Sequence, residues 1–354
     1  MNPRHCIVSL ALLPLAAFAD TSIYSTNFST GALKGTLGDT VNVGDWVIAS
    51  TKNTTSTTGS GSASYAASAF SFGMAGTTSG VIEAQNRFTS TPVTLTNVND
   101  FIKLTVLFTD ANNLIKDNGG GQVLNSTINI GLFDSGSVSP AAGLAAAGLT
   151  ATTGNTNFGT GFAQNWEGYA ARIGSSASTS SSIKQIMTRP KQTANTASAN
   201  QDLLFMGVGG GTYGQNVTVG VPGLSVVSGA STLAGNALVN ATQYQLVYTV
   251  TLSAADQYTI EYQLNSADGL TNLQTISGTT TPSNFITGLS FDGLAVGYRS
   301  AQATGTASNL ATGISLNSVN VSINSASPVP EPSTYAALVG MAGLAFAASR
   351  RRRN

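Results

Sequence analysis

Short runs of alternating apolar and polar residues, separated by clusters of Gly, Ser, Asn and Thr, recur along most of the chain. In YTIEYQL (258–264) every second residue is apolar, and QLVYTVTL (245–252) alternates in the same way. This period of two predicts half-buried β-strands, and the short polar SAADQ between the two runs suits a hairpin connection. Comparable runs predict further strands at 101–108, 127–133, 168–174, 202–209, 291–299 and 314–323.

The last of these runs, ISLNSVNVSI (314–323), changes the parity of its apolar positions partway along. Ile314 and Leu316 share one parity, whereas the three apolar residues after Ser318 share the other. A β-bulge near Asn317 and Ser318 is needed to keep all five on one face of a sheet.

The remaining body offers few other structural signals. AAGLAAAG (141–148) forms at most a short helical turn because glycines bracket it. The low-complexity stretches 49–64 and 174–182 have little to bury and are predicted to be long loops. Since no repeat of fixed period is present, residues 20–326 are expected to form one all-β domain of the sandwich type.

The composition of the 354 residues fits an exported β protein. Only 8% are charged, against about 25% in typical soluble proteins, yet 42% are hydrophobic and can form a core. Residues 20–327 contain 10 basic and 14 acidic residues, which gives this part of the chain a net charge of −4. Glu331 lies outside this range and is not counted. No basic stripe with interleaved aromatics is present, so nucleic acid is not an expected partner.

The first nineteen residues have the pattern of a secretory signal peptide. Arg4 precedes an apolar run, and Ala17 and Ala19 form a small-x-small cleavage site, so residues 1–19 are expected to be removed. Cleavage would remove His5 and Cys6, the single His and the single Cys of the chain. The mature protein would then lack a Cys nucleophile, a Ser-His-Asp triad and any Cys or His metal ligand.

The body resembles the concanavalin-like, or laminin-G-like, jelly-roll group. The resemblance lies in VNVGDWVIAS (41–50), the hairpin YQLVYTVTLSAADQYTIEYQL (244–264), FDGLAVGYRS (291–300) and the closing ISLNSVNVSI (314–323). It implies a jelly-roll-like β-sandwich over roughly residues 22–325. Another β-sandwich, or an irregular β-helix, would share the same pattern of strands.

Two candidate ligand sites follow from residue type. FTDANNLIKDNGGG (108–121) gathers Asp110, Asn112 and Asp117, oxygen ligands of the kind that Ca²⁺ takes, and laminin-G-like domains often hold calcium near their sugar site. An ordinary turn-rich loop uses the same residues. Trp166 and Tyr169, in NWEGYAAR, are candidates to stack on a sugar ring, although Trp is commonly a core residue. No other cofactor is expected.

Catalysis is not expected. A glycoside hydrolase needs two carboxylates about the scissile bond, and the body has only Glu83, Glu167 and Glu261, far apart in sequence. The Glu-x-Asp-x-x-Glu strand motif of jelly-roll glucanases is absent. Hydrolysis is therefore the least favoured of the functional hypotheses.

The C-terminal tail, residues 327–354, predicts a membrane-associated segment. Residues 334–349 are uncharged and, as a helix, would extend about 24 Å, less than the roughly 30 Å hydrocarbon core. The cluster that follows can hold a short transmembrane helix in the inner membrane and stay cytoplasmic. It consists of Arg350, Arg351, Arg352 and Arg353.

The same tail resembles the PEP-CTERM sorting signal of Gram-negative bacteria. The order of VPEPST (329–334), a short apolar segment and an arginine cluster carries the likeness. It implies recognition of Pro330, Glu331 and Pro332 by an exosortase, removal of the tail and delivery to the cell surface, outer membrane or extracellular matrix. The two prolines keep the chain extended beside the bilayer, as an accessible processing site requires.

These observations favour an exported, non-catalytic surface or matrix protein with a structural or adhesive role in biofilm or exopolysaccharide. The alternative is a carbohydrate-binding module of lectin type, dependent on calcium if the loop at 108–121 binds it. A hydrolase is the third hypothesis.

Overall fold

The computed structural model describes sixteen strands. It covers residues 20–29, 33–34, 40–52, 61–66, 68–74, 80–112, 127–140, 166–174, 185–189, 191, 203–204, 238–280, 286, 288–300 and 312–324. Within these ranges no helix occurs, and none of the residues described forms a helix long and apolar enough to cross a membrane. Residues Ser22–Ser325 form one compact unit.

The larger of the two main sheets has eight strands. Seven of these strands form a continuous series in which each strand is antiparallel to its neighbour. The eighth, β1, pairs with β16 and lies outside this series. In spatial order the series runs β13 (Asn272–Thr279), β12 (Gln257–Ser266), β11 (Gln243–Ala254), β7 (Phe101–Asn112), β16 (Thr312–Asn324), β4 (Ala69–Met74) and β3 (Gly61–Ala66), with β1 (Thr21–Thr26) outside it.

The smaller main sheet has six antiparallel strands, and a two-stranded sheet accompanies it. Its order is β10 (Gln185–Arg189), β9 (Glu167–Gly174), β8 (Thr127–Asp134), β15 (Gly293–Ser300), β5 (Gly80–Arg87) and β2 (Trp46–Lys52). The short pair consists of β14 (Ser290–Phe291) and β6 (Val93–Thr94).

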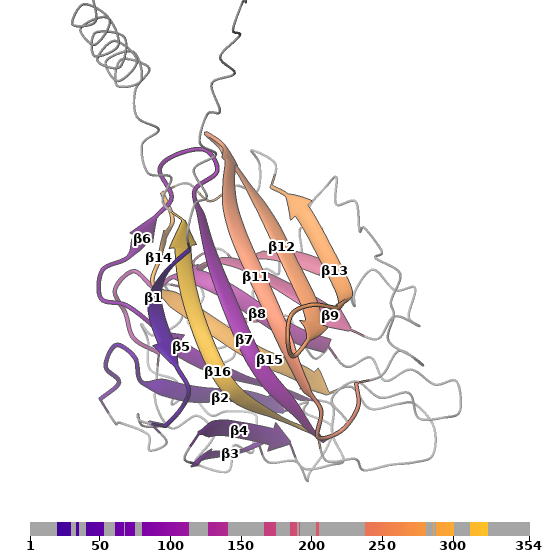
Figure 1. Cartoon of the computed structure of the whole chain (residues 1–354). Coiled ribbons are helices and arrows are strands. Elements are labelled where there is room, and N and C mark those ends of the chain that lie inside the picture. The colour runs from indigo at the N-terminus through magenta and orange to yellow at the C-terminus, as the bar shows by residue number, and fades with distance from the viewer. Residues whose placement is uncertain are drawn as a thin grey trace, which may run out of the picture. The chain divides into compact units, whose positions relative to one another are not determined.

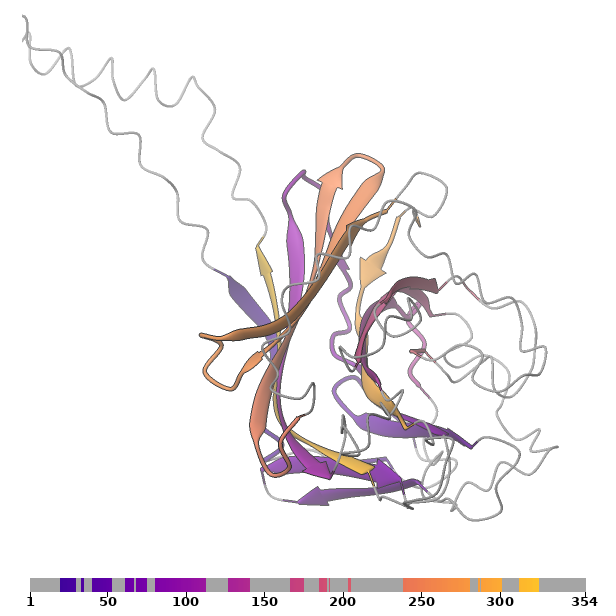
Figure 2. The same cartoon turned by 90° about the vertical axis from the view of Figure 1, so that its right-hand side faces the viewer.

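The two main sheets lie face to face, the larger in front of the smaller in Figure 1 and the two nearly edge-on in Figure 2. The chain passes repeatedly from one sheet to the other, for example from β7 in the larger sheet to β8 in the smaller and from β15 back to β16. This is the all-β, jelly-roll-like sandwich that the sequence predicts, and it excludes the β-helix.

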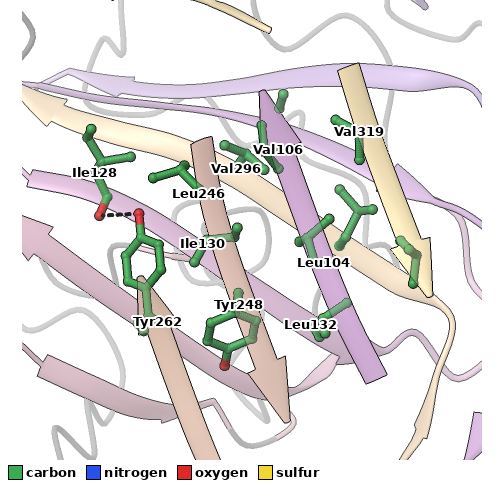
Figure 3. Packing of buried hydrophobic residues seen from close by; sticks show 14 of the residues in the cluster. Leu104, Val106, Ile128, Ile130, Leu132, Leu246, Tyr248, Tyr262, Val296 and Val319 are labelled. Atoms are coloured by element: carbon green, nitrogen blue, oxygen red, sulfur yellow. Dashed lines mark hydrogen bonds between the residues drawn. The ribbon is translucent and has the colours of Figure 1, made fainter. Parts of the chain in front are cut away.

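The core lies between the inner faces of the two sheets. Leu104 and Val106 of β7 belong to the same buried cluster as Ile128 and Ile130 of β8, and Figure 3 shows all four among the side chains packed between the strands. Residues of β12 alternate between buried and half-buried, as the period of two in YTIEYQL predicts. Alternation is therefore what places one face of each strand in the core.

The predicted bulge in the final strand is confirmed. Leu316 of β16 pairs with Phe108 and Ser318 pairs with Leu107, so the register shifts at Asn317. Asn317 Oδ1 accepts a hydrogen bond from Thr109 Oγ1 at 2.9 Å. The extra residue lets the apolar side chains on both sides of it reach the core.

Other predictions are corrected in part. The run 49–64 is not one long loop, because β2 extends to Lys52 and β3 begins at Gly61. The run 291–299 is interrupted at Asp292, between β14 and β15. In the predicted strand 202–209 the described residues, Leu203 and Leu204, form a bend and no strand. AAGLAAAG (141–148) lies outside the described residues.

Two tyrosines within the core differ in their hydrogen bonding. Tyr262 donates from its hydroxyl to the carbonyl of Ile128 at 3.5 Å, whereas the fully buried Tyr248 hydroxyl has no hydrogen-bond partner among the residues that the structure describes. Burial raises the pKa of both well above the ordinary value, so both rings stay neutral. Tyr248 therefore buries a polar group at a net cost.

We expect Tyr248→Phe to stabilise the protein by about 1 kcal/mol, because it removes an unsatisfied buried hydroxyl without changing the shape of the ring. Tyr262→Phe is the matched control and should be neutral or destabilising by up to about 1 kcal/mol, because it gives up a hydrogen bond. Urea unfolding measures both. Equal shifts for the two variants would contradict this account of the core.

Candidate functional site

Polar side chains form a row across the outer face of the smaller sheet. Glu83 of β5 lies between two core residues of its strand, so it points away from the sandwich interior. Gly297 of β15 pairs with both Glu83 and Asn129, and Asn129 pairs with Arg172 of β9. Glu83 and Asn129 are buried although they face outward.

The peptide of Leu203 and Leu204 covers this row. Glu83 accepts the Leu203 N–H with Oε1 at 2.8 Å and the Leu204 N–H with Oε2 at 3.0 Å. Asn129 Nδ2 donates to the Leu204 carbonyl at 2.9 Å, and Gln85 Nε2 donates to Glu83 Oε1 at 2.5 Å. We call Glu83, Gln85 and Asn129 the Glu83 clamp; it fixes a segment of the chain on the sheet.

An apolar cluster, separate from the main core, accompanies the clamp. Its members are all buried and lie on the outer face of the smaller sheet or in the segment that covers it. They are Phe133, Trp166, Ala170, Met187, Leu203, Leu204 and Ala295. The outer face of the smaller sheet is therefore closed over these residues by the protein itself.

Trp166 and Tyr169 are both fully buried, so the prediction that they form an exposed sugar-stacking platform is wrong. The Trp166 ring covers Gly293, where a Cβ atom would overlap it, and Trp166 Nε1 donates to the Val138 carbonyl at 2.8 Å. Tyr169 belongs to the main core, and its hydroxyl accepts the Ile286 N–H at 3.0 Å. Burial raises the pKa of Tyr169. Each ring gains more by packing and satisfying its polar atom inside the protein than by facing water.

The predicted calcium ligands are described only in part. Asp110 is fully buried near the end of β7, and its backbone is held by Ala241 N–H donating to it at 2.7 Å and by its own N–H donating to Thr242 at 3.1 Å. The Asn112 side chain and Asp117 lie outside the described residues. Among those described, no group of three or more His, Cys, Asp or Glu could hold a metal ion. The calcium site stays a prediction.

The three glutamates of the body lie on different faces. Glu83 lies on the outer face of the smaller sheet and Glu261 on the outer face of the larger one. Glu167 is two residues before the core residue Tyr169 on β9, so both lie on the side of the strand that faces the core. Glu167 makes an ion pair with Lys191 at 3.2 Å. No two of the three glutamates therefore lie on the same face of one sheet.

Asp292 is a buried carboxylate that joins three parts of the chain. Its Oδ1 accepts the Ser135 N–H at 2.7 Å, and its Oδ2 accepts the Ser135 hydroxyl at 2.6 Å and Arg87 Nε at 3.0 Å. Asp292 lies at the break between β14 and β15. Every contact is a structural one, so this carboxylate is committed to holding the fold.

The outer face of the larger sheet is polar, and none of the strands labelled in Figure 1 covers it. Its side chains are mainly hydroxyls and amides from β7, β11, β12 and β13, most of them half-buried. We call this surface the hydroxyl face and define it by Thr105, Thr249, Thr251, Thr259, Gln263 and Thr275. It is the side of the sheet turned toward the viewer in Figure 1.

Among the described outward residues of β7, β11, β12 and β13, one is positively and one is negatively charged, and the two lie in a single row. Glu261 of β12 and Lys103 of β7 both pair with Thr249 of β11, one on each side. Lys103 Nζ lies 5.7 Å from the centre of the Phe101 ring, and burial lowers its pKa. The two charges offset each other, so the face as a whole is neutral.

Residues 328–353 match the PEP-CTERM protein-sorting motif. This confirms the resemblance expected for the tail, which lies outside the described residues together with Pro330, Glu331, Pro332, Ala17, Ala19 and the four terminal arginines. The protein is thus an all-β sandwich with a sorting tail. It carries a PEP-CTERM motif, which indicates export and sorting toward the cell surface and implies an exosortase as processing partner.

Comparisons of the whole chain with known proteins show only distant similarity. No curated protein matches it in sequence. Lectin I-B4 from Griffonia simplicifolia, in its metal-free form, is 11% identical with a TM-score of 0.31, over 79% of this chain and 100% of the lectin. A Lotus tetragonolobus seed lectin is 8% identical with a TM-score of 0.29, over 78% and 98% of the two chains. Likenesses this low do not bear on what the chain binds.

We expect Glu83→Gln to lower the free energy of unfolding by about 1–3 kcal/mol, because one of the two buried N–H groups loses its acceptor. Glu261→Gln, on the open face, is the matched control and should change stability by no more than about 0.5 kcal/mol. Chemical denaturation followed by tryptophan fluorescence is suitable, because Trp166 reports on the covered cluster. A Glu83→Gln protein as stable as the Glu261→Gln protein would show that the clamp contributes nothing.

Proposed function

We propose that the protein, once sorted, is a non-catalytic structural or adhesive component of the cell surface or of an exopolysaccharide matrix. The sorting motif at residues 328–353 is the observation that carries this proposal, because it is the address of a protein handled at the membrane and released outward. The motif residues are those of a substrate of the sorting enzyme and perform no catalysis themselves.

The geometry of the body supports a non-catalytic role. Glu83 and Asp292 are buried carboxylates, and their hydrogen bonds to backbone N–H groups hold the chain in place. Glu261 lies on the opposite side of the sandwich from Glu83. A surface of repeated hydroxyls and amides suits contact with hydrated polymers rather than a bond-breaking reaction.

A carbohydrate-binding module is the second candidate, favoured by the hydroxyl face. If Asp110, Asn112 and Asp117 hold calcium, sugar binding on a glycan array would be lost in EDTA. Binding in both conditions would separate sugar recognition from calcium, and a blank array in both would contradict a module specific for small glycans.

For the sorting tail, we expect surface-located protein to lack the C-terminal peptide and to retain β16 through Asn324. Glu331→Ala should leave a longer form in the inner membrane, because it removes the charged residue of the recognition element. Ser333→Ala, two residues further on, is the matched control and should be processed. Mass spectrometry of fractionated cells distinguishes these forms. An intact terminus containing Arg350 on surface-located wild-type protein would contradict processing.

A further inference from the structure

We propose that the hydroxyl face binds an extended, uncharged polysaccharide. The inference rests on the proposed function and names the partner of the open surface. Each strand contributes outward side chains about 6.8 Å apart, and neighbouring strands lie about 4.8 Å apart. The surface therefore repeats in two directions and suits a polymer with repeating hydroxyls.

The two charged side chains of the hydroxyl face disfavour binding of a charged polymer. Lys103 and Glu261 lie on either side of Thr249 and offset each other. A polyanion would meet Glu261 as well as Lys103, and a polycation would meet Lys103 as well as Glu261. A neutral partner whose groups both donate and accept hydrogen bonds can use the threonines and amides without either penalty.

Three threonine hydroxyls at the centre of the face are available to such a partner. Thr249 and Thr251 follow each other on the outer side of β11, and Thr105 lies diagonally across on β7. Within the described structure no hydrogen bond is found for any of the three hydroxyls. All three residues are half-buried. They are fixed by their strands and still open to a ligand.

The flank of the face is held in place by its own hydrogen bonds. Gln263 donates to Glu261 at 2.5 Å, and Asn272 donates to Asn265 at 2.8 Å. The hydroxyls of Thr259 and Thr279 share a hydrogen bond of 3.1 Å. Side chains ordered before binding lose less entropy when a ligand arrives.

Apolar side chains among the polar ones fit the same partner. Phe101, Leu107 and Val247 are half-buried on this face. Sugar rings present C–H groups as well as hydroxyls, so they can contact both kinds of side chain. Because the face is a surface of many small contacts, affinity should come from repeated contacts along one polymer chain.

Affinity electrophoresis of the mature, exported protein tests the proposal. Native gels would contain dextran, galactomannan, hydroxyethylcellulose or, as the anionic comparison, alginate. We expect retardation in at least one neutral gel, unchanged by 0.5 M salt. The triple variant Thr105→Val, Thr249→Val, Thr251→Val should lower the association constant at least about tenfold, because three hydrogen-bonding groups are removed at nearly constant shape.

The matched control replaces three loop threonines, Thr91→Val, Thr242→Val and Thr271→Val, and should be retarded like the wild type. Several results would overturn the proposal: no retardation in any neutral gel, retardation only in alginate, or a face variant retarded as strongly as the control. Urea unfolding of both variants shows that they are folded. Tail processing in the same cells tests the proposed export separately, so the two can fail independently.

Discussion

The pairing of β16 with β7 joins the two parts of the larger sheet, and the rest of the sandwich depends on its register. Along the path of that sheet, β4 and β3 connect to β7 only through β16, and β1 also pairs with β16. The bulge at Asn317 places Leu316 opposite Phe108 and Val319 opposite Val106. Without the extra residue, one half of β16 would turn its apolar side chains outward, because a shift of one residue exchanges the two faces. The same register that closes the core thus keeps the outer face polar.

Much of the fold could be predicted because several strands show an alternation of apolar and polar residues within their own short segments. The hairpin of β11 and β12, the parity change in β16 and the tail motif each lie within a short run of residues. The Glu83 clamp could not be predicted, because Glu83 and Leu203 are separated by 120 residues. Residue type also could not show that Trp166 is buried, since that depends on Gly293 leaving room for its ring. The composition of the run 49–64 does not predict β3, because this strand has few apolar side chains and is held by backbone pairing with β4.

The two outer faces of the sandwich differ in what covers them. The face of the smaller sheet is occupied by Leu203 and Leu204, which Glu83 and Asn129 hold through backbone groups. The described face of the larger sheet is polar and neutral, and it is where we propose that a partner binds. Since β16 ends at Asn324 and the sorting motif begins at residue 328, the tail can be removed without loss of the strand that closes the fold.

The dependence on β16 can be measured most directly with two truncated chains, residues 20–327 and residues 20–311. The account predicts that the longer chain unfolds in urea in one cooperative transition, with the midpoint of the processed protein. The shorter chain should show no such transition, because β4, β3 and β1 lose their link to β7 and the core is left open on one side. A shorter chain that unfolds cooperatively at the same midpoint would contradict the claim that β16 closes the sandwich.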